Sequence, residues 1–516
     1  MEQLINTTTN LSDTKITISS AEVEKIIPIF QEGQFFSKGV KIAKFFYKKR
    51  ENNEKEEENN IRKPIYIQSP IFGYIKKINI EEKSIVLSPC LHEVFYGNLC
   101  AKCGYKRTEE EIKKSENYKI YSSLSNDLTF DKNSAKKMEE KVINRYLNKK
   151  KLILLLDLDN TILHACGYHL NKEDYNYLKE KYKENISEIG IRNKYDKQRY
   201  DKIIIKFRVH LKEFFSSLEN KYEIFTYTHG AQEYASSIIQ YINNYIYPNS
   251  LSTERLICRE VNNGIIKNKT IKKVFPTKEN MVVIIDDRSD VWKENKENLI
   301  NVHGYFFFFD EYMNNIKAPF LNYDYDNALF VILNLLNYIR GEFYDFYERN
   351  KLKKSVSIII KEKLFSVFNN EKFYYLQDEK IAECDKIYLR NNIKIQIKKL
   401  GGELIENNEE INKGENSDLI KNINILLIDR NDKDDKVIQL FKKNEKKILF
   451  CNYINICFMF YYKIDYDEFE VNDEKEIIKF IDLVSIFNKH KERIIEFYKS
   501  KLDKKKEKEK EIENKN

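Results

Sequence analysis

The chain has 516 residues, enough for two to four domains, and its 89 Lys and Arg against 81 Asp and Glu give a net charge of +8. That surplus is too small to predict a basic nucleic-acid-binding surface. No apolar run approaches the roughly 18 residues of a membrane-spanning helix, and residues 1–10 lack the basic and apolar parts of a secretory signal. Eight cysteines at no even spacing argue against a disulfide-stapled secreted module, so we expect a soluble intracellular protein with no direct nucleic-acid partner and no membrane partner.

The first part of the chain divides by composition. The polar run KKRENNEKEEENN at 48–60 contains nothing to bury, and we expect it to be a solvated loop. Short β-branched and aromatic runs follow, broken by Pro64, Pro70 and Gly73, and they predict a small β region. The predicted divisions are a variable segment at 1–60, the β region at 61–105 and a mostly polar linker with some helix at 106–145.

Four metal-binding side chains lie within the small β region. Their spacing is C-x-H-x7-C-x2-C, and CAKCG at 100–104 has the tight turn that lets two thiolates reach one zinc ion. The candidate zinc ligands are Cys90, His92, Cys100 and Cys103. A set of small buried residues without a metal is the equal alternative, because C-x-H pairs are uncommon in zinc ribbons.

In the middle of the chain, apolar runs of strand length alternate with helical periodicity, which is the pattern of a parallel sheet covered by helices. The expected strands are LILLLDL at 152–158, YEIFTYT at 222–228, MVVIIDD at 281–287 and YFFFF at 305–309. Tyr234 is placed on the apolar face of one helix, and a stripe from Leu329 to Phe343 predicts the helix that closes the domain. We therefore predict an α/β domain over residues 146–350.

A second, smaller α/β part is predicted over residues 353–475. SVSIII at 355–360 and INILLID at 423–429 have the composition of strands, and IQIKKLGG at 395–402 has the pattern of a helix that ends at paired glycines. Residues 476–516 are expected to be a helix and a charged tail whose last sixteen residues are disordered, because they are almost without apolar side chains.

Two acids follow the first strand of the central domain. DLDNT at 157–161 begins at the carboxyl end of an otherwise apolar strand, which is where ligands bind in open α/β sheets. Period-2 alternation puts Asp157 and Asp159 on the same side of the chain, where they repel each other unless a divalent cation or a shared proton compensates. A solvated turn after a buried strand is the alternative, because such short motifs recur by chance.

Two further strands end in complementary chemistry. One finishes in Thr228, followed by His229, and the other finishes in Asp286 and Asp287. Because the carboxyl ends of parallel strands share one edge of a sheet, we expect these side chains to converge. A lysine cluster lies between these two strands in the sequence: Lys267, Lys269, Lys272 and Lys273. The alternative to a role in the site is that these lysines form an ordinary exposed helix face. His229 and His164 either tune the site or serve packing.

Together these residues supply what phosphoryl transfer needs. Carboxylates are suitable ligands for Mg²⁺. Asp157 would attack phosphorus to form an aspartyl-phosphate, and Asp159 would protonate the departing oxygen and later take a proton from water. Thr228 and one lysine would hold the non-bridging oxygens. The absence of a Walker-type glycine-rich loop argues against an ATP-driven kinase.

These motifs resemble the haloacid dehalogenase superfamily. More narrowly, LDLDNTILHA at 156–165, YTHGAQEYA at 227–235 and VFPTKENMVVIIDDRSDVW at 274–292 resemble the RNA polymerase II C-terminal-domain phosphatases that carry a BRCT domain. LSPCLHEVFYGNLCAKCGYKR at 87–107 is similar to the segment before the catalytic domain in that family. ILFCNYINICFMFYYKIDYDEF at 448–469 is similar to a BRCT domain that has Tyr in place of the usual Trp, although a generic α/β module stays open.

The resemblance implies a role for each matching residue. Asp157 matches the nucleophile, Asp159 the general acid/base, Thr228 the phosphate-contacting hydroxyl and Lys269 the phosphate-binding lysine. The implied metal ligands are Asp157, Asp159, Asp286 and Asp287. In KFRVHL, Arg208 matches the substrate-binding Arg of the family's K-x-R-P-G-L segment, but Val209 and His210 replace Pro and Gly, which puts the local turn in doubt.

The resemblance thus implies a haloacid-dehalogenase-like Rossmannoid parallel sheet, a C-terminal BRCT-like domain and a small N-terminal β region with a candidate zinc cluster. It also implies a nuclear, Mg²⁺-dependent protein serine/threonine phosphatase that acts on the phosphorylated C-terminal domain of RNA polymerase II, with general transcription factor F as a partner. Two alternatives stay open. A small-molecule or other phosphoprotein phosphatase of the superfamily would usually need a large cap, and a scaffold with an inactive phosphatase domain would not need the intact set of acids.

Overall fold

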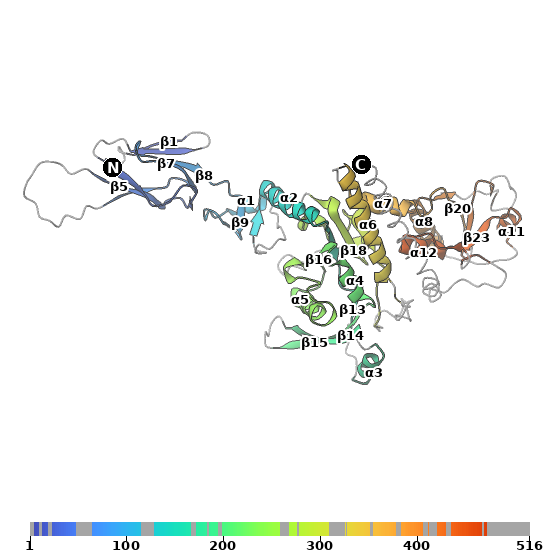
Figure 1. Cartoon of the computed structure of the whole chain (residues 1–516). Coiled ribbons are helices and arrows are strands. Elements are labelled where there is room, and N and C mark those ends of the chain that lie inside the picture. Colours follow the sequence, from blue (N-terminus) through green and yellow to red (C-terminus); the bar gives the residue numbers. More distant parts are fainter. Residues whose placement is uncertain are drawn as a thin grey trace, which may run out of the picture. The chain divides into compact units, whose positions relative to one another are not determined.

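The structure is a computed structural model (Figure 1). The described residues are 5–9, 13–18, 23–47, 64–114, 128–166, 172–182, 185–193, 199–258, 268–275, 278–308, 326, 328–350, 354–377, 383–405, 411, 420–429, 435–466 and 469–471. The polar run at 48–60 and the charged tail at 476–516 lie outside them. The chain divides into two compact units, and each is described by itself: residues 1–143 with 272–277, and residues 144–271 with 278–516.

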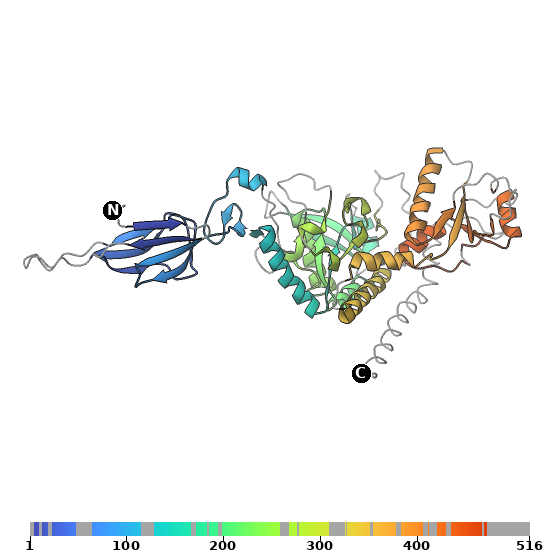
Figure 2. The same cartoon turned by 90° about the horizontal axis from the view of Figure 1, so that it is seen from above.

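The first unit begins with eight short strands in two antiparallel sheets, drawn in blue in Figure 2. The strands are β1 (Ile5–Thr9), β2 (Thr14–Ile18), β3 (Val23–Pro28), β4 (Phe35–Phe36), β5 (Lys41–Tyr47), β6 (Ile65–Gln68), β7 (Gly73–Asn79) and β8 (Ser84–Pro89). The sheet orders are β1-β2-β8-β7-β4 and β3-β5-β6. Ile16, Phe45 and Leu87 share one apolar core. Since β2 pairs with β8 and β5 with β6, the division expected at residue 60 runs through a single β unit.

A smaller sheet completes the first unit. It has the order β10-β9-β11 and is formed by β9 (Val94–Tyr96), β10 (Leu99–Cys100) and β11 (Leu128–Phe130). The expected linker contains two helices, α1 (Glu109–Lys114) and α2 (Lys132–Asn148). The Thr108 hydroxyl accepts from the Glu111 N–H at 3.3 Å, and the Glu111 carboxylate accepts from the Thr108 N–H at 2.8 Å. This reciprocal pair is a capping box, which fixes where α1 begins.

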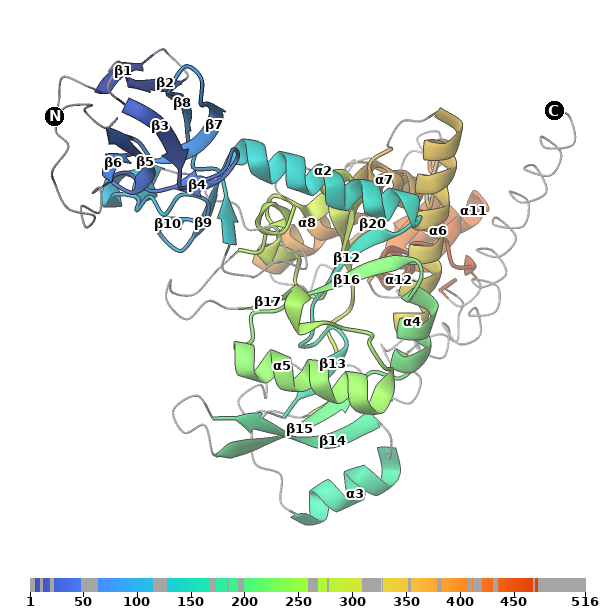
Figure 3. The same ribbon diagram turned by 60° about the vertical axis from the view of Figure 1, so that its left-hand side comes forward.

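The second unit contains the predicted parallel sheet, so the α/β fold class is confirmed. Its order is β17-β16-β12-β18-β19, formed by β12 (Leu152–Leu156), β16 (Tyr222–Tyr227), β17 (Leu256–Ile257), β18 (Val282–Asp286) and β19 (Leu299–Asn301). All residues of β12 and β18 are buried, as expected for central strands covered on both faces. The covering helices are α4 (Leu211–Leu218), α5 (Gln232–Tyr241) and α6 (Ala328–Asn350) (Figure 3).

An antiparallel insertion extends this domain after the first strand. Its three strands have the order β13-β15-β14, with β13 (Leu163–Ala165), β14 (Ile186–Arg192) and β15 (Tyr200–Phe207), and α3 (Lys172–Tyr182) belongs to the same insertion. Helix α5 contacts β14, so the insertion lies against the helix that follows β16. Both β13 and α5 adjoin the loops that carry the predicted site.

The strand expected at 305–309 is wrong. β19 occupies the edge of the sheet, and residues 305–308 have no strand structure. The Tyr305 N–H donates instead to the Asn160 carbonyl at 2.7 Å, and the Phe308 N–H donates to Nδ1 of His164 at 2.9 Å. Tyr305 and Phe308 are therefore buried without strand pairing, whereas Phe306 is exposed.

The C-terminal part of the second unit has a four-stranded parallel sheet of order β21-β20-β22-β23. Its strands are β20 (Lys372–Leu376), β21 (Glu403–Ile405), β22 (Ile425–Ile428) and β23 (Lys447–Phe450), and its helices are α7 (Val356–Phe365), α8 (Glu383–Lys399), α11 (Lys436–Lys443) and α12 (Asn452–Phe460). Tyr453 and Cys457 are buried in its core. None of the helices in the described part of the chain has both the length and the apolar character needed to cross a membrane.

One expected strand of this part is a helix. SVSIII at 355–360 begins α7, because the buried residues recur at helical spacing: Val356, Ile359, Ile360 and Lys363. The expected helix at 395–402 is the end of α8, and Gly401 follows it with φ +90°. A Cβ at Gly401 would lie 1.9 Å from the Phe365 carbonyl oxygen, so both the backbone conformation and the space require glycine.

Candidate active site

The loop after β12 carries the first two acids. The Asp157 N–H donates to the Ile285 carbonyl at 3.0 Å, which extends the pairing of β12 with β18 by one residue and fixes Asp157 at the edge of the sheet. Asn160 then takes φ +59°, and the N–H groups of Thr161, Ile162 and Leu163 all point to the Leu158 carbonyl. This sharp turn brings Thr161 back toward the same edge.

Lys269 joins the ends of two strands. Its Nζ lies 2.7 Å from Oδ1 of Asp157 and 2.6 Å from Oδ2 of Asp286, and Lys269 is only 3% exposed. Oδ2 of Asp286 also accepts from Nε1 of Trp292 at 2.8 Å, and its Oδ1 accepts from the Arg288 N–H at 2.8 Å. Both carboxylate oxygens of Asp286 therefore accept hydrogen bonds.

The structure separates Lys269 from the other members of the lysine cluster. The Lys269 N–H donates to the Val291 carbonyl at 2.8 Å, which fixes the backbone from which its side chain reaches the acids. Lys272 is exposed, and Lys267 lies outside the described residues. Burial by itself would lower the pKa of Lys269, but the charges of Asp157 and Asp286 raise it above the usual value, so the ammonium stays charged.

Asp287 lies beside Asp157 with Thr161 between them. The Thr161 hydroxyl donates to Oδ1 of Asp287 at 3.3 Å and to Oδ2 of Asp157 at 3.5 Å, and it accepts from the Asp287 N–H at 3.1 Å. One carboxylate oxygen each from Asp157, Asp286 and Asp287 lie within 4.8 Å of one another. These three residues are the oxygen donors that could hold a small hard cation.

Asp159 turns away from the three clustered acids. Its Oδ1 accepts from the Tyr234 hydroxyl at 2.5 Å, and its Oδ2 accepts from the Thr228 hydroxyl at 3.5 Å. The Thr228 hydroxyl in turn accepts from the Gly230 N–H at 3.0 Å. Although the resemblance implies a metal-ligand role for Asp159 as well, its side chain lies instead among hydroxyl groups at the ends of β16 and α5.

Tyr234 is a site residue that the sequence pattern did not identify. Its spacing places it on an apolar helical face, and an aromatic ring at that spacing is usually a core residue. The signal that could have identified it is its position in the first turn of the helix that follows a strand ending in Thr228. A first-turn side chain lies at the same edge of the sheet as the preceding strand end, so its hydroxyl can reach Asp159.

The acids share more negative charge than Lys269 balances. Burial raises the pKa of Asp157 well above its usual value, and the Asp286 charge adds to this against the opposing effect of Lys269. Burial, followed by the Asp286 charge, raises the pKa of Asp287 to about 6. Burial also raises the pKa of Asp159, partly offset by the Tyr234 hydrogen bond. Clustered carboxylate oxygens with surplus negative charge suit Mg²⁺, which would favour their ionised forms.

Arg208 is not directed at the acids. Its Nη1 lies 3.0 and 2.9 Å from the two carboxylate oxygens of Asp326, its Nη2 donates to the His303 carbonyl, and it is 2% exposed. In the turn that follows, Val209 and His210 stand where the family motif has Pro and Gly. His210 adopts φ +65°, the conformation that glycine takes without strain, at the position where the family motif has Gly.

The two histidines beside the motifs have different surroundings. Nδ1 of His164 accepts from the Phe308 N–H, so His164 helps to hold the aromatic run. Burial, followed by the nearby charge of Lys269, lowers the pKa of His229 below its usual value. A neutral imidazole therefore adjoins Thr228.

The first unit brings the four candidate zinc ligands together. One ligand atom from each of Cys90, His92, Cys100 and Cys103 lies within 4.8 Å of the others, with 3.7 Å between Sγ of Cys90 and Sγ of Cys100 and 3.4 Å between Sγ of Cys103 and Nδ1 of His92. All three cysteines are free thiols. Burial raises the pKa of Cys103 to about 12, so the thiol would need a metal ion to become a thiolate at neutral pH.

The domain that holds the acids is similar to known proteins. Residues 152–347 match the family model described as NLI interacting factor-like phosphatase. An RNA polymerase II C-terminal domain phosphatase of Schizosaccharomyces pombe is 30% identical over 311 residues, covering 54% of this chain and 40% of that protein. One of the same name from Caenorhabditis elegans is 29% identical over 241 residues, covering 45% and 34%. The chain thus spans less than half the length of these two relatives.

A solved structure of the fission yeast RNA polymerase II CTD phosphatase Fcp1, bound to beryllium fluoride, aligns with 65% of this chain and 100% of that chain at 18% identity and a TM-score of 0.47. The family match covers all the strand ends described above, from Asp157 to Asp287. The match to the NLI interacting factor-like phosphatase model thus spans the parallel sheet together with the acids at its edge.

Proposed function

We propose that this chain is a Mg²⁺-dependent protein serine/threonine phosphatase that removes phosphate from the heptad repeats of RNA polymerase II. The observation that carries the proposal is the division of the acids into two sets. Asp157 is bonded to Lys269 beside Asp286 and Asp287, and Asp159 is bonded to Thr228 and Tyr234. One carboxylate can thus work as a nucleophile while the other handles protons.

In the first step, a carboxylate oxygen of Asp157 attacks phosphorus and forms an aspartyl-phosphate as the bond from phosphorus to the serine oxygen breaks. The Asp159 carboxyl gives its proton to the departing oxygen, which leaves as the serine hydroxyl. The raised pKa of Asp159, caused by burial, keeps that proton available. The Tyr234 hydrogen bond fixes the carboxyl that makes the transfer.

In the second step, water attacks the aspartyl-phosphate and gives a proton to the Asp159 carboxylate. The bond from phosphorus to Asp157 breaks, which releases inorganic phosphate and regenerates both carboxyl groups. Lys269 and the Thr228 hydroxyl stand at the two sides of this edge, where they can hold non-bridging oxygens. Mg²⁺ held by Asp157, Asp286 and Asp287 would supply positive charge for the phosphoryl oxygens.

The substrate part of the proposal is supported by the names of the curated relatives, which are RNA polymerase II C-terminal domain phosphatases from several organisms. It is also supported by the modest size of the insertion formed by β13 to β15 and α3. A site with only a modest insertion beside it suits a segment of polypeptide. The assignment as an RNA polymerase II phosphatase also implies a nuclear location and an interaction with general transcription factor F.

The decisive experiment is Mg²⁺-dependent phosphate release from phosphorylated heptad-repeat peptides by the whole chain. We expect Asp157→Asn to abolish turnover and Asp159→Asn to lower kcat by about 10²- to 10⁴-fold, the usual contribution of a general acid. The matched control is Asp201→Asn at the exposed first end of β15, which should keep wild-type activity. Wild-type turnover by Asp157→Asn would refute the aspartyl-phosphate mechanism.

The same assay separates the alternatives. Turnover of p-nitrophenyl phosphate or of metabolites without turnover of repeat peptides would favour a small-molecule phosphatase. Binding of phosphorylated repeats without turnover of any phosphomonoester would favour a scaffold. The bonding of Lys269 to both Asp157 and Asp286 speaks against the scaffold, because a domain that had lost catalysis would have no need of a buried, charged triad.

We also propose that Cys90, His92, Cys100 and Cys103 hold a structural Zn²⁺ ion, because four Cys and His ligands complete a closed tetrahedral site. Metal analysis of the purified chain should find about one zinc per molecule. Cys103→Ser should lose it, whereas Cys258→Ser, at a half-buried cysteine elsewhere, should retain it. Clearly less than stoichiometric zinc in the wild type would contradict this site.

A further inference from the structure

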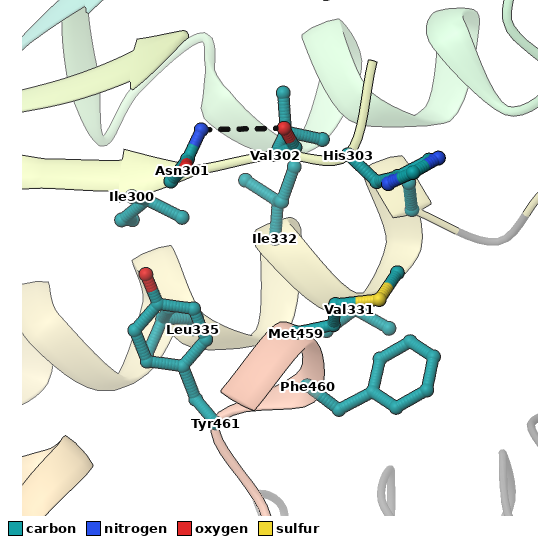
Figure 4. Close-up of a pocket in the computed structure, with 11 residues that line it drawn as sticks. Ile300, Asn301, Val302, His303, Val331, Ile332, Leu335, Met459, Phe460 and Tyr461 are labelled. Atoms are coloured by element: carbon teal, nitrogen blue, oxygen red, sulfur yellow. Dashed lines mark hydrogen bonds between the residues drawn. The ribbon is translucent and has the colours of Figure 1, made fainter. Parts of the chain in front are cut away.

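The C-terminal part of the second unit contacts the catalytic sheet at its edge strand β19. β19 is bonded to β18 on one side only, where the Val302 N–H donates to the Asp286 carbonyl at 3.1 Å. Successive N–H groups of a strand point to opposite sides, so the Asn301 N–H faces away from β18. It faces the hydroxyl of Tyr461, and both residues line the same small cavity. Figure 4 shows the Tyr461 ring pointing from the end of α12 toward β19.

The side chain of the same Asn301 holds the backbone of the acid pair. Its Nδ2 donates to the Asp286 carbonyl at 3.1 Å and to the Asp287 carbonyl at 2.8 Å. Asn301 therefore has its backbone beside the Tyr461 hydroxyl and its amide bonded to the two peptide units that carry Asp286 and Asp287. A shift of Asn301 would move the backbone from which both carboxylates project.

Tyr461 occupies an unusual backbone conformation for an aromatic residue. It ends α12 with φ +53° and ψ +31°, and its N–H donates to the Cys457 carbonyl. Glycine is the usual residue at this position of a helix end, and a left-handed residue with a side chain costs about 1–2 kcal/mol. The side chain is nonetheless 3% exposed. A tyrosine in this strained backbone conformation indicates that the position requires the tyrosine side chain, since glycine would form the same turn without strain.

The cavity at this contact is too small to be a ligand pocket. A cavity of about 30 Å³ lies beside the Tyr461 ring, lined mainly by apolar side chains that include Ile300, Ile332, Leu335 and Met459 (Figure 4). That volume holds a water molecule or two and excludes a substrate or cofactor. The Tyr461 hydroxyl is therefore a polar group that faces the Asn301 backbone within an otherwise apolar contact.

We propose that Tyr461 is a positioning residue for the candidate metal site: by fixing Asn301, the C-terminal part of the chain holds the backbone of Asp286 and Asp287 in the arrangement that binds Mg²⁺. The inference rests on the proposed Mg²⁺ site. It assigns the C-terminal α/β part a role in catalysis that does not depend on any partner it binds.

The test is a Mg²⁺ titration of Tyr461→Phe, which keeps the ring and removes the hydroxyl. Trp292 is the only tryptophan in the sequence and its Nε1 is bonded to Asp286, so its fluorescence reports on the site without turnover. We expect the Kd for Mg²⁺ to rise about three- to tenfold, the size of effect that the loss of one polar contact usually has. Calorimetry provides a second binding measurement, and the melting midpoint shows whether the variant is folded.

The matched control is Tyr466→Phe, which removes a hydroxyl bonded to Glu371 within the same part of the chain and should leave the Kd unchanged. Asn301→Ala should weaken Mg²⁺ binding at least as much as Tyr461→Phe. In turnover assays, Tyr461→Phe should need more Mg²⁺ for half-maximal rate but approach wild-type kcat at saturation. A Mg²⁺ titration of Tyr461→Phe that superimposes on the wild type would overturn the inference.

The outcome is separable from that of the proposed function. If repeat peptides are not hydrolysed but Mg²⁺ binds and Tyr461→Phe weakens it, the substrate assignment fails and this inference stands. If the wild type binds no Mg²⁺ in either measurement, the metal site and this inference fail together.

Discussion

Lys269 is the side chain whose removal should most disturb the site. It is buried and bonded to Asp157 and Asp286, so Lys269→Met leaves the clustered carboxylates without a nearby compensating cation. Removing one partner of a buried ion pair costs about 3–5 kcal/mol. For a domain of this size, 1 kcal/mol corresponds to roughly 2–4 °C in Tm, so we expect a decrease of about 6–20 °C at pH 7 with a chelator present.

Trp292 fluorescence is the assay for this unfolding, because the indole is bonded to one of the affected acids. Mg²⁺ should stabilise Lys269→Met more than the wild type, since it replaces the lost positive charge. Lowering the pH from 7 to 5 should also reduce the deficit, because carboxyls with a raised pKa take up protons and lose their mutual repulsion. Lys293→Met, at an exposed lysine, is the control. An unchanged Tm in Lys269→Met would refute the electrostatic account.

Three further changes test other parts of the structure. Tyr234→Phe removes the hydrogen bond that lowers the pKa of Asp159, so the alkaline limb of the kcat/KM profile should move to higher pH while the maximal rate falls. Burial lowers the pKa of His303 to about 4, against about 6.5 when unfolded, so this residue's contribution is present above pH 6.5 and is lost as the pH falls toward 4. His303→Gln should therefore flatten the fall in Tm over that range. Gly401→Ala should destabilise the C-terminal part by at least about 1–3 kcal/mol in thermal unfolding, because its Cβ would meet the Phe365 carbonyl oxygen.

The sheet and its functional edge could be predicted from the sequence. Apolar runs indicate which strands are buried, and the polar residues that follow them mark where the strands end. β12, β16 and β18 lie where the apolar runs place them, and their ends converge as parallel topology requires. Residues 305–308 and 355–360 are not the strands that the sequence predicts, because aromatic and β-branched composition alone does not distinguish a strand from a loop or a helix. In the second run, the buried residues recur at three- and four-residue spacing, which was the better signal.

Side-chain partners could not be predicted where the regular backbone ends. Alternation puts Asp157 and Asp159 on one side only while the chain is extended, but β12 ends at Leu156 and the left-handed Asn160 turns the chain. Asp159 therefore meets Tyr234 rather than the other acids. Arg208 likewise is bonded to Asp326, more than a hundred residues away, and no local pattern reports such a pairing.

The adjacent acids Asp286 and Asp287 were expected to serve the metal alike, but their bonding gives them different capacities. Both oxygens of Asp286 already accept hydrogen bonds, from Lys269 and Trp292 on one side and from the Arg288 N–H on the other. The Asp287 carboxylate instead accepts a longer side-chain bond from the Thr161 hydroxyl, at 3.3 Å. A cation at this edge would therefore draw more of its coordination from Asp287, while Asp286 anchors the lysine that faces the nucleophile. The difference arises from which side chains the next strand and loop supply, which adjacent identical residues in a sequence do not reveal.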